Sequence, residues 1–149
     1  MGLFDKLKSA VNAVTGNAAK VTMEFQPAVG FPGQVVQVRI TATSTGGALN
    51  SKGVFVDLLG TEAIHLKGGD HDVHHSETTL TTELQVGGPF QLGPNETKQF
   101  AGQFTVPPNA QPSYAGRHVH HTWQIRGRIE ATGNDPDTGF LAFRIGLAQ

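Results

Sequence analysis

Large apolar side chains recur at every second position over most of the chain from Lys20 onward, and this is the period of β-strands with one buried face. Turn residues such as glycine, proline and asparagine separate the alternating runs. The expected strands span residues 20–25, 34–44, 52–59, 78–86, 99–106, 119–131 and 140–147. Strands of this length with turns at short intervals predict an all-β fold, an immunoglobulin-like antiparallel β-sandwich.

The same alternation predicts which side chains are buried. Arg126 and Arg128 occupy the other face of their strand and are expected to lie in water. The glycine-rich run from Gly68 to His75 is expected to be a solvated loop. The core is expected to contain Val36, Val38, Ile40, Ala42, Val54, Val56, Leu58, Phe100, Phe104, Val106, Val119, Trp123, Ile125, Ile129, Leu141, Phe143, Ile145 and Leu147.

Composition excludes several classes of function. The chain has 149 residues, enough for one domain with its own core, and a formal net charge of −1 without the basic face that nucleic acids require. It has no cysteine, so disulfides, thiolate metal sites and cysteine nucleophiles are excluded. No secretory leader or membrane-spanning run is recognisable, and we expect a cytoplasmic protein.

The N-terminal segment has a different period. Leu3, Phe4, Leu7, Val11 and Val14 share one face at helical spacing, which predicts an amphipathic helix and linker over residues 1–17 and a sandwich over 18–149. Such a short helix is marginal in water, so its apolar face needs a cover and is our candidate partner-binding surface. The cover could be its own sheet, a partner protein or second copy, or, more weakly, a membrane surface.

The predicted sheet has one apolar surface on which the N-terminal helix could pack. Phe55 and Leu59 lie on the apparently outer face of the strand over residues 52–59, where the helix could pack.

Two blocks are more specific than alternation. Phe31-Pro32-Gly33-Gln34 is a turn that opens a strand. The block from Phe90 to Ile129 combines a strand with Phe100 and Phe104, a Pro112-Ser113-Tyr114-Ala115-Gly116 turn and a long strand containing Trp123. Both resemble the motifs of arrestin-type domains, and among these the bacterial sporulation-control proteins of the arrestin-like class.

The resemblance implies a non-enzymatic scaffold or adaptor that binds a protein partner or self-associates, in a regulatory or assembly-forming role and without a cofactor. Arrestins usually pair two such sandwiches, whereas this sequence provides for one. The buried charged core and the phosphate-sensing basic pair of animal arrestins have no identifiable counterpart in the sequence. Binding of phosphorylated receptors is therefore not expected.

Seven histidines give a competing hypothesis, a zinc- or copper-binding β-sandwich protein or enzyme. The candidate ligands are His71, His74, His75, His118 and His120, in two clusters that must meet in space to form a site. Their spacing matches no closed zinc motif, and solvated loops often carry histidine and aspartate. No catalytic acid–base pair or nucleophile is recognisable in the sequence.

Overall fold

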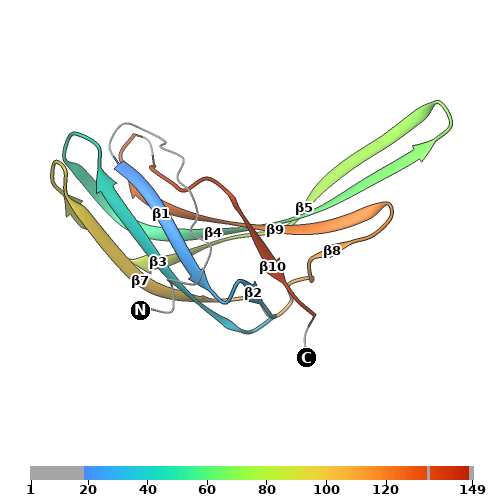
Figure 1. Cartoon of the computed structure of the whole chain (residues 1–149), viewed down its shortest axis with the longest axis horizontal. Coiled ribbons are helices and arrows are strands. Elements are labelled where there is room, and N and C mark those ends of the chain that lie inside the picture. The colour runs from blue at the N-terminus through green and yellow to red at the C-terminus, as the bar shows by residue number, and fades with distance from the viewer. Residues whose placement is uncertain (1–18, 134, 148–149) are drawn as a thin grey trace.

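A computed structural model describes residues 19–133 and 135–147, which form two facing β-sheets (Figure 1). The smaller sheet has the strand order β1-β3-β7 and the larger β2-β10-β9-β4-β5, with β6 paired to β4 and β8 to β9. All pairings are antiparallel except β2 with β10. The strands are β1 (Ala19–Gln26), β2 (Val29–Gly30), β3 (Val35–Ser44), β4 (Leu49–Gly68), β5 (His71–Gly87), β6 (Phe90–Leu92), β7 (Thr97–Thr105), β8 (Tyr114–Ala115), β9 (Val119–Ala131) and β10 (Leu141–Ile145).

The core lies between the two sheets and confirms the predicted alternation at almost every position. Trp123 is the largest of the fully buried side chains, and the inward residues of β3, β4 and β9 are buried in the same core cluster. Leu147 is an exception, since its side chain is 73% exposed and the prediction that it is buried is wrong. Its strand β10 ends at Ile145, so the alternation no longer places Leu147 under the opposite sheet.

The turn over Phe31-Pro32-Gly33-Gln34 is a type II turn. Proline occupies the second position and Gly33 the third, with a φ of +84° that favours glycine. The Gln34 N–H donates to the Phe31 carbonyl at 2.9 Å, and the Gln34 side-chain oxygen accepts from the Phe31 N–H at 3.0 Å. Gly33 then donates to the carbonyl of Val106 at 2.9 Å, which ties the turn to the end of β7.

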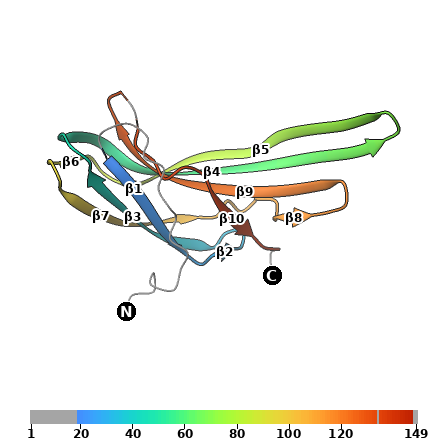
Figure 2. The same cartoon turned by 45° about the horizontal axis from the view of Figure 1, so that its top comes forward.

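Strands β4 and β5 are much longer than the sequence predicts. β4 continues nine residues past Leu59, and the expected loop from Gly68 to His75 is a tight turn at Gly69–Asp70 flanked by strand. A register shift between Gly60 and Thr61 marks where the β4–β5 hairpin leaves the sandwich. We call residues 61–78 the arm; it projects beyond the two layers in both views (Figure 2).

The predicted N-terminal helix lies outside the described residues, as do its apolar residues Leu3, Phe4, Leu7, Val11 and Val14. It therefore stays a prediction. The residues that the structure describes contain no helix, and hence none suited to crossing a membrane.

Candidate functional site on the arm and the outer sheet face

The arm presents apolar side chains to solvent on the face that continues the core side of the sheet. Leu66 and Val73 are direct cross-strand partners, and their side chains are 44% and 50% exposed. Ile64 lies on the same face opposite Val119 of β9, and both are half-buried. These four residues form a small apolar patch on an element that stands away from the core, where a partner can reach it.

Strand β5 forms the edge of the larger sheet along the arm, and some of its backbone N–H and C=O groups point away from β4. The N–H of His65 donates to the carbonyl of His118 at 2.8 Å, so the backbone of His65 faces β9 and not β5. Its cross-strand partner on β5, His74, therefore turns its own N–H and C=O away from β4. Asp72 and Ser76, two residues to either side, have the same orientation. Along the arm no described strand pairs with this edge.

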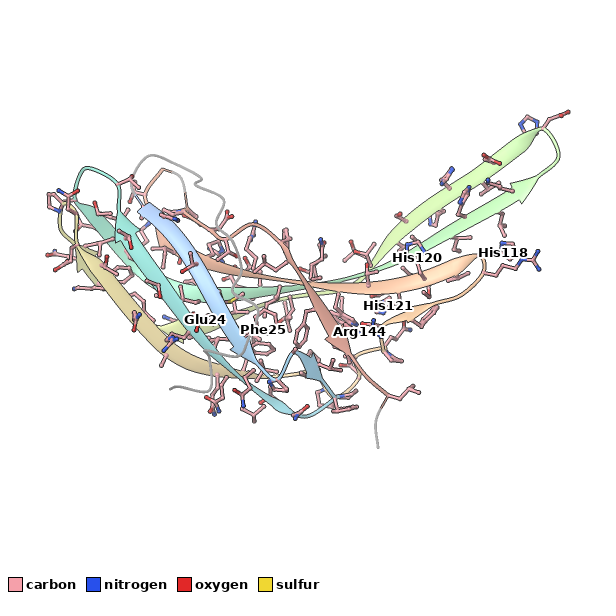
Figure 3. The ribbon with its side chains drawn as sticks, in the orientation of Figure 1. Glu24, Phe25, His118, His120, His121 and Arg144 are labelled. Atoms are coloured by element: carbon pink, nitrogen blue, oxygen red, sulfur yellow. The ribbon has the colours of Figure 1, made fainter. Side chains whose placement is uncertain are left out.

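The structure brings part of the two predicted histidine clusters together. His118 lies just before the first residue of β9 and His120 is the second residue of that strand (Figure 3). His120 is the cross-strand partner of Ala63, which lies two residues from His65 on the same face of β4. His74 lies on this face too, and its ring stacks on that of His65 with centroids 3.9 Å apart. We call the side of the arm that carries His65, His74 and His120 the histidine face; it is turned away from the core.

His71 and His75 do not share the histidine face. They alternate with His74 along β5 and therefore point to the opposite side of the arm, the side of Leu66 and Val73. The sequence-based ligand set is thus divided between two faces. It also omits His65 and Asp72, which the β4–β5 register places beside His74.

The buried histidine, His121, anchors the Pro112 turn. Its Nδ1 lies 3.1 Å from the carbonyl of Pro112, which can only accept, so Nδ1 carries the proton. In the neutral ring, Nε2 then accepts a hydrogen bond from the hydroxyl of Thr79, 2.7 Å away. Both ring nitrogens are occupied within the chain, and His121 has a structural role.

Two further contacts hold the same turn. The indole N–H of Trp123 donates to the carbonyl of Gln111 at 2.8 Å. Ser113 exchanges hydrogen bonds with Ile145: its N–H donates to the Ile145 carbonyl, and its hydroxyl accepts from the Ile145 N–H. The most specific motif in the sequence is therefore a loop fastened to β9 and β10.

Tyr114 follows that turn and is bonded to a carboxylate. Its hydroxyl donates to Glu62 of β4 at 2.7 Å, and this hydrogen bond raises the pKa of Tyr114 above its ordinary value. Tyr114 pairs with His121, which in turn pairs with Glu62 across β8, β9 and β4. The short strand β8 thereby supports the sheet at the base of the arm.

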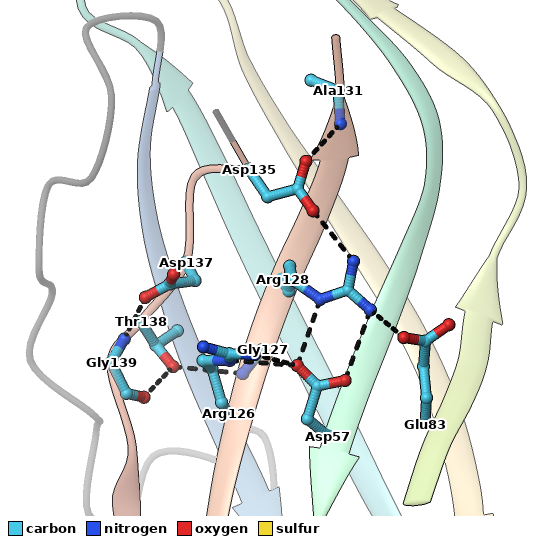
Figure 4. Close-up of polar contacts among 10 residues, drawn as sticks. All are labelled: Asp57, Glu83, Arg126, Gly127, Arg128, Ala131, Asp135, Asp137, Thr138 and Gly139. Atoms are coloured by element: carbon cyan, nitrogen blue, oxygen red, sulfur yellow. Dashed lines mark hydrogen bonds and ion pairs between the residues drawn. The ribbon is translucent and has the colours of Figure 1, made fainter. Parts of the chain in front are cut away.

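The outer face of the larger sheet contains an ionic cluster (Figure 4). Arg128 of β9 donates from Nε and Nη2 to the two carboxylate oxygens of Asp57 at 3.1 and 3.3 Å. It also donates to Glu83 at 2.6 Å and to Asp135 at 3.0 Å. Arg126 donates to Asp57 from its Nε at 3.0 Å. Two guanidinium groups are thus shared among three carboxylates.

This cluster overturns the expectation that Arg128 lies in water. Asp57 and Arg128 are only 9% and 8% exposed, so Arg128 does not lie in water and a buried charged group is present. Burial lowers the pKa of Arg128, but hydrogen bonds and attraction from Asp57, with help from Asp135 and Glu83, outweigh it and raise this pKa above its ordinary value. The guanidinium also lies 5.0 Å from the ring centroid of Phe55, part of the patch proposed to receive the N-terminal helix.

Comparison with solved structures identifies the fold. Spo0M, a sporulation control protein from Bacillus subtilis, matches 91% of this chain with a TM-score of 0.63 and 22% sequence identity. The chain has the fold of Spo0M. It spans about half of the Spo0M chain, 51% of its length. No protein-family model matches the sequence, and a search of curated proteins finds no match.

The match to Spo0M confirms the resemblance to arrestin-like sporulation-control proteins at the level of fold. It accounts for the two-sheet arrangement and covers most of the described residues. At 22% sequence identity, the match shows that Spo0M and this chain share an architecture. The functional hypothesis for this chain therefore rests on its own arm and sheet faces.

Proposed function

We propose that this chain is a non-enzymatic protein-interaction scaffold of the arrestin-like class. In this proposal an extended strand of a partner protein pairs with the free edge of β5 on the arm. The observation that carries it is the outward orientation of the backbone at Asp72, His74 and Ser76, described above. Proteins use such edges to add a strand from a partner, with main-chain hydrogen bonds supplying affinity.

The neighbouring side chains favour a partner strand with apolar residues at alternate positions. Added beside β5, such a strand would lie next to Val73 and extend the face on which Leu66 is exposed. A regulatory role accords with the description of Spo0M as a sporulation control protein. Location in the cytoplasm is part of the proposal.

A proline substitution in β5 tests the proposal. Ser76→Pro removes an N–H that faces outward, so the β4–β5 pairing is kept while the edge loses a donor and gains a ring. With a photo-crosslinking residue at position 73, we expect a defined protein adduct in the native cell that Ser76→Pro abolishes. Ser76→Ala, which keeps the N–H, is the matched control and should retain the adduct.

A second control uses the same crosslinker at Gln99, an exposed position on β7 in the other sheet, where no such adduct is expected. An adduct that survives Ser76→Pro, or that forms equally at position 99, would count against strand addition at the arm. The absence of any adduct at position 73 would do the same.

A further inference from the structure

We propose that the histidine face of the arm binds one divalent transition-metal ion, of the zinc class, through His65, His74 and Asp72. The atoms that these three residues offer as ligands lie within 4.8 Å of one another. Two imidazoles and one carboxylate are a donor set that zinc accepts, and copper, nickel and cobalt also bind imidazole-rich sites. This set differs from the five candidate histidines of the sequence-based hypothesis, of which it keeps only His74.

Strand geometry places the ligands without help from a flexible loop. Because the backbone of His65 faces β9, His65 and His74 form a non-hydrogen-bonded cross-strand pair, the kind in which side chains approach most closely. Their rings are stacked with an interplanar angle of 20°. Asp72 precedes His74 by two residues on the same strand and therefore lies on the same face.

An unsatisfied nitrogen points independently to a ligand. The Nε2 atom of His65 is buried and has no hydrogen-bond partner among the described residues. A buried polar atom without a partner is unfavourable, and one explanation for such an atom is that it serves as a ligand to a bound ion. A metal ion bound at this nitrogen would satisfy it, while His74 and Asp72, which are exposed, would complete the coordination from the solvent side.

The site would join β4 to β5 about midway along the arm, because its ligands come from both strands. Three protein ligands leave a tetrahedral ion one further position, which we expect water or His118 on the adjoining part of the same face to fill. A metal held in this way would fix the register of the arm. The proposal is independent of strand addition at the β5 edge, since it uses side chains and not the edge backbone.

Titration of untagged protein with Zn²⁺ by calorimetry tests the site, with Co²⁺ absorption as a second readout of coordination. We expect one ion per monomer. His65→Ala and His74→Ala should each weaken binding at least about 10-fold, because even the loss of an outer-shell partner of a metal ligand has an effect of that order. Asp72→Asn should also weaken it.

Two histidines on the opposite face provide matched controls. His71→Ala and His75→Ala remove the same chemical group from the same strand but should leave affinity for Zn²⁺ unchanged. All positions are at or near the surface of the arm, and circular dichroism will verify that each variant keeps its fold. Absence of Zn²⁺ binding, or equal losses for His75→Ala and His74→Ala, would overturn the site. So would half an ion per chain with dimerisation in light scattering, which would place the ligands on two copies.

Discussion

Replacing Arg128 with methionine is expected to lower the free energy of unfolding by about 3 kcal/mol, the scale seen when one partner of a buried ion pair is removed. Methionine keeps most of the length and the apolar stem of the side chain. It removes both hydrogen bonds to Asp57 and leaves that carboxylate, 9% exposed, with the guanidinium of Arg126 as its remaining ion-pair partner. It also removes the cation from the ring of Phe55.

The matched control for this prediction is Arg126→Met. Arg126 also bonds to Asp57, but its side chain is 30% exposed, and solvent screening should limit the loss to about 1 kcal/mol or less. Urea denaturation of both variants beside the parent chain gives the comparison. Equal losses for the two variants would show that burial of Arg128 does not set the strength of the cluster.

Replacing Trp123 with alanine is expected to lower the free energy of unfolding by about 4 kcal/mol, as is typical of large aromatic side chains truncated in a core. The Trp123 side chain is 2% exposed and packs edge-on against the ring of His121. Its indole also holds the Pro112 turn through the carbonyl of Gln111. Loss of the side chain should therefore both open a cavity and release that turn.

Trp123→Phe separates these two effects. Phenylalanine keeps an aromatic ring in the core but cannot donate to Gln111, so we expect a smaller loss of stability together with faster amide exchange at Ser113. Thermal or urea denaturation measures the first effect and NMR-detected exchange the second. Unchanged exchange at Ser113 in both variants would show that the turn is held without Trp123.

Much of the sandwich is predictable because its strands have one face buried. Val36, Val38 and Ile40 are all buried, as the alternation indicates, and the bounds of β9 coincide with the predicted 119–131. The Phe31-Pro32-Gly33-Gln34 turn has the conformation that its proline and glycine favour. In each case the local sequence preference and the packing favour the same structure, so the sequence pattern is enough to predict it.

The arm is not predictable in the same way. Beyond Thr61 the hairpin is exposed on its outer face, and in β5 the run from His71 to Thr78 contains a single apolar side chain, that of Val73. A strand is recognised from apolar residues at every second position, and the β5 half of the arm has too few apolar residues to show that pattern. Gly68 and Gly69 do indicate a turn, but they do not show how far the strands extend on either side.

The two polar clusters depend on register, which a single sequence does not contain. His65 and His74 become neighbours only because β4 pairs with β5 at that offset, and Asp72 joins them by its place on the same strand. Asp57 and Arg128 lie 71 positions apart in the chain and meet across β4 and β9. Alternation does place Arg128 on the outer face correctly, but it cannot show that carboxylates and the ring of Phe55 cover it.

Residue-resolved amide exchange along β5 tests the scaffold proposal most directly, with the protein alone and bound to the partner captured at position 73. In the free protein the amides of Asp72, His74 and Ser76 should exchange quickly, because they face outward, while the alternate amides bonded to β4 exchange slowly. In the complex, we expect these three amides to become protected as well. Fast exchange at all three in the bound state, with new protection confined to other strands, would contradict strand addition at the arm.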